Sequence, residues 1–417
     1  SFMYPDIEFT NLDFRFFNEQ EDFAFFKYDS ILDPNILGYG GEVEIIGDIY
    51  VSSDKVTSYG KIETNNSSFI SDNFSYNQNL IVSENTSLKL SASNHAKGLM
   101  EAEDVFFKYD LAKNKMEFKS LFFDERNFIF PEYDLSTSLS NAEWLISKGS
   151  IEVNASSDEI HSVYSLSNNF YNWDFISNSF SLDLNTKTIN AKGVPDIQVA
   201  DAYIIPENEE LYIREGFQIL PLSNSVLVLD TINEFHRFVN SNVSVLTQDK
   251  FEGKGVYEYV NFDLDTFNIP FSQFELKNVN NNQLTSFSAG DVSELNPILM
   301  EPGFNFYGNI ELLANSEQLL FNGSIIPSEI EGFNISNAIP FNEYFVPGDE
   351  LTLTISDKDG FYNAAISKVS NNLFFDFFNN PVNKKSLVFF NPEGLLSYDP
   401  FTKEYLIETK SKRDQDV

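Results

Sequence analysis

The sequence predicts an all-β fold, an elongated stack of antiparallel hairpins in sandwich- or jellyroll-like layers. The chain has 417 residues, with 43 Phe and 19 Tyr against 2 Trp and 4 Met. Phe, Tyr, Ile and Val favour a pleated, half-buried surface, whereas Asn, Ser and Thr compete for the backbone hydrogen bonds of a helix. Apolar and polar residues also alternate with a period of two along most of the chain, which places successive side chains on opposite faces of a strand.

The clearest hairpin is expected over residues 105–119, where two alternating stretches flank a short polar break. The side chains expected on its packed face are Val105, Phe107, Tyr109, Leu111, Met116 and Phe118. The side chains expected to face solvent include Lys108, Asp110, Lys115, Glu117 and Lys119. The pentapeptide FFKYD on the first strand also occurs at residues 25–29, which suggests a reused building block.

The same plan returns further along the chain. Phe180, Leu182 and Leu184 precede a turn at 185–187, and Ile189 follows it. Further turns are expected at 315–316, at 357–360 and between Asp399 and Lys403, because Asp and Asn side chains can bond the backbone two residues on. Two short segments, 141–149 and 230–238, are helix candidates, and either could instead form a strand.

The domain organisation is expected to follow breaks near residues 85, 200 and 300. The regions are an N-terminal β region (1–85), a hairpin-repeat β domain (86–200), a β domain (201–300) and a C-terminal β domain (301–417). Pro195 and Pro206 mark the second break, and two prolines near residue 300 mark the third.

The charge and the cysteine count exclude several classes of function. The net charge is -36 and the sequence pI is about 4.2, so phosphate backbones and anionic headgroups are repelled and no nucleic-acid partner is expected. The chain holds no cysteine, which excludes disulfides and thiol chemistry. No apolar run reaches the ~20 residues of a membrane-spanning helix. The start lacks the pattern of a secretion signal, so we expect a mature product or an excised fragment.

No catalytic constellation stands out, and we expect no enzymatic activity. With 63 acidic residues, no carboxylate pair is informative. His95, His161 and His236 lack metal-site spacing, and a lone histidine is usually a surface or hydrogen-bonded residue. Calcium is the only cofactor for which the sequence offers ligands: Asp357 and Asp359 form a fragment of an oxygen-rich loop. A tight turn explains the same residues and is favoured.

The surplus of aromatic residues has three explanations, of which packing in a core is favoured. The second is an apolar trough that faces a lipid or a partner strand. Its candidate residues are Phe107, Tyr109, Met116, Phe118, Phe180, Leu182, Leu184 and Ile189. The third is a platform for sugars, formed by Trp144, Tyr171 and Trp173.

Two resemblances bear on location. The segments "KGVPDIQVADAYIIPENEELYI" and "FHRFVNSNVSVLTQDKFEGKGVYEYVNFD" resemble a group of very large exported proteins of Bacteroidota, over residues 85 to 410. In that group a strand ending Gly-Val, an "ADA.I.P" segment and a "Y.G.G.Y.Y" strand follow in order. Here these are Gly193-Val194, the segment from Ala200 to Pro206, and the strand from Phe251, which stands in place of the tyrosine, to Tyr259. The resemblance implies an envelope location and no named activity.

The hairpin units at 102–119 and 180–193 are also similar to the repeats of the OstA-like lipopolysaccharide-transport proteins. In that family, stacked hairpins form a curved β-jellyroll whose apolar groove carries acyl chains. The spacing between the units here is irregular.

The expected function is therefore a structural or interaction module of a large exported envelope protein, located in the periplasm, at the outer membrane or on the cell surface. Its expected partners are other envelope or cell-surface proteins. A lipid-binding or lipid-conducting β-groove is the first alternative, and a carbohydrate-binding surface protein is the second.

Overall fold

The computed structural model shows an all-β chain of antiparallel strands, as predicted. It describes residues 5–10, 12–17, 22–27, 35–65, 67–91, 97–122, 126–156, 160–279, 283–328, 338–355, 364–369, 372–376, 387–390 and 394–409. Within these ranges the only helices are single 3₁₀ turns: η1 Tyr39–Gly41, η2 Pro131–Tyr133, η3 Ile146–Lys148, η4 Asn168–Phe170 and η5 Glu207–Glu209.

The chain divides into two compact units. The first holds most residues up to Val199, with Ile204–Leu222 and Ser244–Asp249. The second holds Ala200–Tyr203, Ser223–Val243 and the chain from Lys250 onward. Strands β19 (Ile197–Val199), β20 (Ala202–Ile205), β23 (Leu222–Leu229) and β24 (His236–Thr247) lie in the segments where the chain passes from one unit to the other. The four regions expected from the sequence stay a prediction.

In the first unit, twenty strands of the described residues form one antiparallel sheet. Their bounds are β1 Ile7–Thr10, β2 Leu12–Phe17, β3 Asp22–Lys27, β4 Asn35–Gly38, β5 Val43–Val51, β6 Val56–Thr64, β7 Ser67–Asn77, β8 Leu80–Leu90, β9 Met100–Asp110, β10 Lys115–Ser120, β11 Phe128–Phe130, β12 Leu135–Thr137, β13 Asn141–Leu145, β14 Ser150–Asn154, β15 Ser162–Ser165, β16 Asp174–Ile176, β17 Ser179–Asp183, β18 Thr188–Lys192, β21 Glu210–Arg214 and β22 Gln218–Ile219.

This sheet splits into two ladders that both begin at β9. The C-terminal part of β9 pairs with β10, and β13, β14, β17, β18 and β21 follow in that order. The start of β9 pairs with β11, and β12, β15 and β16 follow. Phe130 of β11 and Phe180 of β17 meet with ring centroids 5.1 Å apart. The two ladders therefore pack against each other as layers, with aromatic side chains in the core between them.

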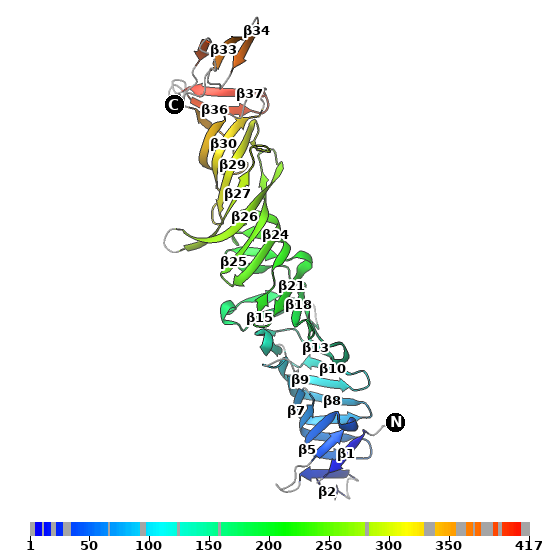
Figure 1. Ribbon diagram of the computed structural model, residues 1–417. Helices are drawn as coiled ribbons and strands as arrows, with labels where there is room; N and C mark the ends of the chain where they lie inside the picture. Colours follow the sequence, from blue (N-terminus) through cyan, green and yellow to red (C-terminus); the bar gives the residue numbers. More distant parts are fainter. Residues whose placement is uncertain are drawn as a thin grey trace. The chain divides into compact units, whose positions relative to one another are not determined.

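In the second unit, β25, β26, β27, β29 and β30 pair in order (Figure 1). Strand β31 pairs with β30, and β28 pairs with β29. Two three-stranded sheets follow, β32–β36–β37 and β34–β33–β35. The bounds are β25 Lys250–Val260, β26 Thr266–Val279, β27 Gln283–Val292, β28 Ile298–Glu301, β29 Phe304–Leu313, β30 Leu319–Pro327, β31 Ile339–Phe345, β32 Leu353–Ile355, β33 Ala364–Val369, β34 Asn372–Asp376, β35 Leu387–Phe390, β36 Gly394–Asp399 and β37 Glu404–Thr409.

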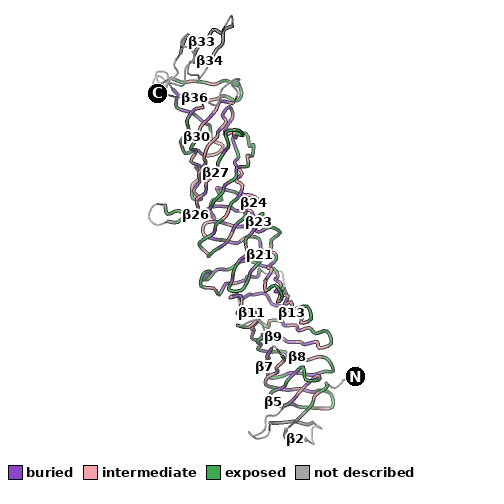
Figure 2. The backbone as a smooth tube through the Cα atoms, in the orientation of Figure 1, coloured by how far each residue is buried: buried purple, intermediate pink, exposed green. Residues whose placement is uncertain are grey.

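Burial alternates along the strands with the period that the sequence predicts (Figure 2). In the hairpin of β9 and β10, Val105, Phe107 and Phe118 are buried, and Phe107 lies directly opposite Phe118. The Phe69 and Phe107 rings stack with centroids 4.4 Å apart. The predicted hairpin is therefore confirmed, and its packed face meets the neighbouring strands.

Paired glycines lie opposite each other in one hairpin of each unit. Gly47 of β5 lies opposite Gly60 of β6, and Gly308 of β29 lies opposite Gly323 of β30. At Gly308 the φ angle is +138°, and a Cβ atom there would collide with the backbone of Gly323. Only glycine allows two backbones to approach this closely, so the two units use the same device.

Most of the other turns that the sequence indicates are also confirmed. Strands β17 and β18, β29 and β30, and β36 and β37 form hairpins around the expected positions. The hairpin expected across residues 357–360 is wrong, because β32 pairs with β36 and β33 pairs with β34 and β35. The turn itself lies outside the described residues. Both helix candidates form strands and turns: residues 141–149 form β13 and η3, and residues 230–238 form a turn that leads into β24.

Candidate functional site

A cavity in the second unit combines apolar walls with buried and exposed carboxyl groups. Its volume is about 400 Å³, within the size range of small-ligand sites. Its lining residues, which define the Glu301 pocket, are Phe262, Glu301, Pro302, Phe304, Glu350, Leu351, Ser397, Tyr398, Asp399, Pro400, Phe401 and Leu406.

The apolar wall of the Glu301 pocket continues onto the surface. Phe304 and Leu351 form its buried part. Phe401, Phe262 and Leu406 form its rim and expose 97%, 55% and 50% of their areas. Single exposed apolar residues are normal, but several around one cavity are typical of an interaction site.

A bulge turns Glu301 into the protein. The pairing of β28 with β29 shifts register between Leu299 and Glu301, so that both Met300 and Glu301 are buried. The turn after Glu301 passes through Gly303, whose φ is +82° and whose position leaves no room for a Cβ atom against the Tyr398 ring. Bulges commonly re-aim a side chain in this way.

The Glu301 carboxyl holds two loops of the second unit. Its Oε2 accepts the N–H of Phe262 at 3.0 Å, and its Oε1 accepts the N–H of Gly348 at 3.2 Å. The Tyr259 hydroxyl lies 3.5 Å from Oε1 and donates to the carbonyl of Met300 at 2.9 Å. Burial raises the pKa of Glu301 to about 7, although the two backbone N–H groups act in the opposite direction.

Asp399 forms the turn that presents Phe401. Its Oδ1 accepts the N–H of Phe401 at 2.8 Å and the N–H of Thr402 at 3.3 Å, and its carbonyl accepts the N–H of Lys403 at 2.8 Å. The N–H of Phe401 and then that of Thr402 lower the pKa of Asp399. This carboxylate is ionised at neutral pH and stands at the rim of the pocket.

The Glu301 carboxyl already has hydrogen-bond partners inside the protein. A pKa near 7 is useful in a general acid or base, but the oxygens of Glu301 are engaged by backbone N–H groups and by Tyr259. Within the part of the chain that the structure describes, no group of three or more His, Cys, Asp or Glu could hold a metal ion.

A second cavity, of about 440 Å³, lies in the first unit beside β8 and β9. Three of its charged side chains have polar partners: Lys89 lies 3.2 Å from Glu101, and Asn85 donates to Asp104 at 3.0 Å. This cavity therefore combines charges of both signs and gives less basis for selecting a ligand.

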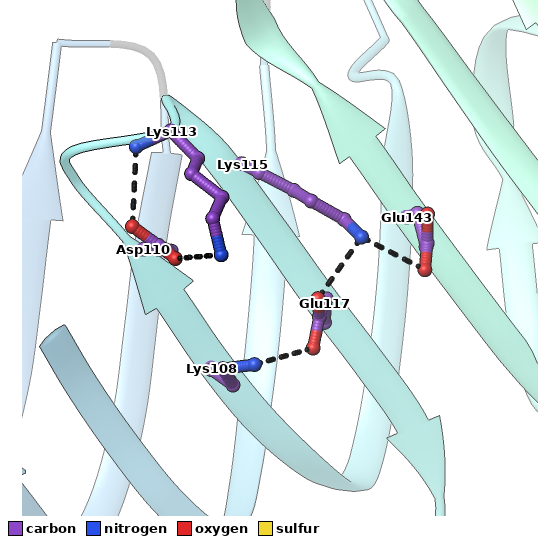
Figure 3. A network of polar contacts seen from close by, with 6 residues as sticks. All are labelled: Lys108, Asp110, Lys113, Lys115, Glu117 and Glu143. Carbon is purple, nitrogen blue, oxygen red and sulfur yellow. Dashed lines mark hydrogen bonds and ion pairs between the residues drawn. The ribbon is translucent and has the colours of Figure 1, made fainter.

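A network of charges crosses the outer face of β9, β10 and β13 (Figure 3). Lys115 lies 3.0 Å from both Glu117 and Glu143, and Lys108 lies 3.0 Å from Glu117. Burial acts to raise the pKa of Glu117, but the two lysines outweigh it and lower that pKa. Because these charges neutralise one another, the network serves the sheet and leaves little charge for a ligand.

Seven of the eight residues predicted to face a lipid or a partner are buried in the first unit: Phe107, Tyr109, Met116, Phe118, Phe180, Leu182 and Ile189. Leu184 is half-buried. The first four lie on β9 and β10, and the other three lie on β17 and β18. Their role in binding stays a prediction.

The three residues predicted to form a sugar platform differ in exposure. Tyr171 exposes 68% of its area, whereas Trp144 and Trp173 are buried. Trp173 donates its indole N–H to the carbonyl of Gln198 at 2.6 Å and packs against Phe217. The sugar-binding role of these residues also stays a prediction. The calcium candidates Asp357 and Asp359 lie outside the described residues.

Two of the histidines are hydrogen-bonded inside the protein. His161 Nδ1 lies 3.1 Å from the carbonyl of Ser138. His236 Nε2 donates to the carbonyl of Ser316 at 2.7 Å, and its Nδ1 therefore accepts from the Tyr257 hydroxyl at 3.2 Å. Burial lowers the pKa of His236. His95 lies outside the described residues.

Searches against models of known families, against curated proteins and against solved structures found no match to this chain. Among the residues that the structure describes, no helix is both long enough and apolar enough to cross a membrane. The functional assignment therefore depends on the chemistry of the sites.

Proposed function

We propose that the chain is a non-catalytic interaction module, in which an all-β scaffold presents the Glu301 pocket to a partner. The observation that carries this proposal is the continuity of the cavity with the exposed apolar rim of Phe262, Phe401 and Leu406. Burying such a rim against a partner removes apolar area from water and gains about 25 cal/mol for each Å².

The rim belongs to an ordered framework. The Asp399 turn fixes Phe401, and the Glu301 carboxyl fixes the backbone of Phe262. Loops that are ordered before binding lose less conformational entropy on association. This preorganisation supports a binding role for the pocket.

We further propose that the module belongs to a large exported envelope protein whose partners are other envelope or cell-surface proteins. The resemblance of residues 85 to 410 to exported Bacteroidota proteins supports this location, as does the acidic, cysteine-free composition. Fractionation of the source cells, with an antibody against the chain, tests it. Recovery in the envelope or medium is expected, and recovery in the cytosol alone contradicts it.

Binding of Nile red, an uncharged dye whose fluorescence rises in apolar surroundings, tests the pocket. We expect the full chain to bind the dye and Phe401→Ser to weaken binding severalfold. The matched control is Ile232→Ser, because Ile232 is 86% exposed and lies outside the pocket. Absence of dye binding, or equal weakening by both substitutions, would contradict the proposed site.

A further inference from the structure

The Glu301 pocket is acidic as well as apolar. Glu301, Glu350 and Asp399 line it, and the lining residues that the structure describes include no lysine or arginine. Lys403 belongs to the same turn as Asp399 but is not part of the lining. An anionic ligand such as a fatty acid would therefore be disfavoured, and a cation would be favoured.

Aromatic rings in the same wall favour a delocalised cation. Phe262, Phe304, Tyr398 and Phe401 all line the cavity. Ring faces attract cations, and the planar guanidinium of arginine can stack on a ring while it donates hydrogen bonds to carboxylates. A lysine ammonium holds its hydration more strongly and matches this wall less well.

The rim distinguishes a peptide from a small amine. The cavity has a volume of about 400 Å³, but Phe401 is almost completely exposed beyond it. A small amine that fills the cavity leaves Phe401 in water, whereas an extended segment can cover it with neighbouring apolar side chains.

We infer that the Glu301 pocket takes an arginine side chain flanked by aromatic side chains, presented by an extended segment of a partner protein. This inference rests on the proposed function and specifies its ligand. The carboxylates select the charge, the rings of the wall receive the guanidinium plane, and the exposed rim receives the flanking side chains.

The test uses a fluorescein-labelled peptide, Gly-Ser-Phe-Arg-Phe-Ser-Gly, and a matched peptide with citrulline in place of arginine. Fluorescence anisotropy with the full chain measures both affinities. Citrulline keeps the shape of arginine and removes its charge. We expect the arginine peptide to bind about fivefold to tenfold more tightly, the range given by one cation–π contact and one partly exposed ion pair.

Variants locate the preference within the pocket. The double variant Glu350→Gln, Asp399→Asn should reduce the preference for arginine to about twofold or less. Asn at 399 can accept the same two backbone N–H groups as Asp399. The control Glu317→Gln removes an exposed acid outside the pocket and should leave the preference unchanged.

The outcomes separate the two proposals. Equal binding of both peptides, together with Nile red binding that depends on Phe401, overturns the arginine inference and leaves the proposed function standing. Absence of both peptide and dye binding overturns both. If benzylamine, a small aromatic amine, binds as tightly as the arginine peptide and Phe401→Ser has no effect on either, the occupant is a small cation and the peptide inference is wrong.

Discussion

Replacing Glu301 by glutamine tests whether its carboxyl is buried as the structure shows. Glutamine has nearly the same shape and cannot ionise. In the native protein Glu301 is 2% exposed, and burial raises its pKa from 4.5 to about 7. Each pKa unit corresponds to about 1.4 kcal/mol, so ionising this group in the folded state costs at most about 3 kcal/mol.

The sign of the effect follows from proton linkage. Because the folded state holds the proton more tightly than the unfolded state, the stabilisation by protonation of Glu301 is complete below pH 4.5. It is lost as the pH rises through about 7. Relative to Glu301→Gln, the native protein should therefore lose up to about 3 kcal/mol of unfolding free energy between pH 4.5 and pH 8.

Urea unfolding of both proteins at several pH values between 4.5 and 8 measures this difference. Comparing the two proteins cancels the titration of the many surface acids, which they share. A difference that stays constant within about 0.5 kcal/mol across this range, below one half of a pKa unit, would refute the reasoning. It would mean that the carboxyl is solvated rather than buried.

Three further substitutions test the scaffold. Phe107→Ala should cost about 3–5 kcal/mol of unfolding free energy, because the ring is buried against Phe69. The control is Phe106→Ala on the other face of the strand, and an equal loss of stability in both variants would contradict the burial of Phe107 in the core. Gly308→Ala should cost about 1–3 kcal/mol of unfolding free energy and speed amide exchange in β29 and β30, because the added Cβ atom meets the facing backbone. Unchanged amide exchange would contradict the close approach of the two backbones. Lys115→Met should cost about 1 kcal/mol of unfolding free energy or less, and this cost should disappear at high salt. Urea unfolding at two salt concentrations measures it, and a larger loss that does not depend on salt would contradict a surface network of charges.

The local architecture of this protein could be predicted from its sequence. Period-two alternation identified the packed face of β9 and β10, and turn residues such as Asp399 identified hairpin ends. These features depend on residues close together along the chain. Non-local pairing could not be predicted in this way. The pairing of β14 with β17 and the division of β9 between two ladders depend on contacts between distant segments.

The Glu301 pocket illustrates the limit of periodicity. Strict alternation from the buried residues Ile298 and Met300 would place Glu301 toward solvent, but the bulge in β28 turns it inward. The sequence offers one signal, the Glu-Pro-Gly segment that begins at Glu301, and it predicts a boundary near residue 300. Phe262 and Phe401 reach the same cavity from opposite sides of that boundary, and no local pattern connects them.

Amide hydrogen exchange of the full chain, with and without the arginine peptide, tests the binding role of the Glu301 pocket most directly. The account predicts slower exchange on peptide addition in three segments: residues 261–265, 346–351 and 397–406, which surround the pocket. The account is contradicted if exchange in these three segments is unchanged, whether the peptide slows exchange in β9 to β18 instead or in no segment at all.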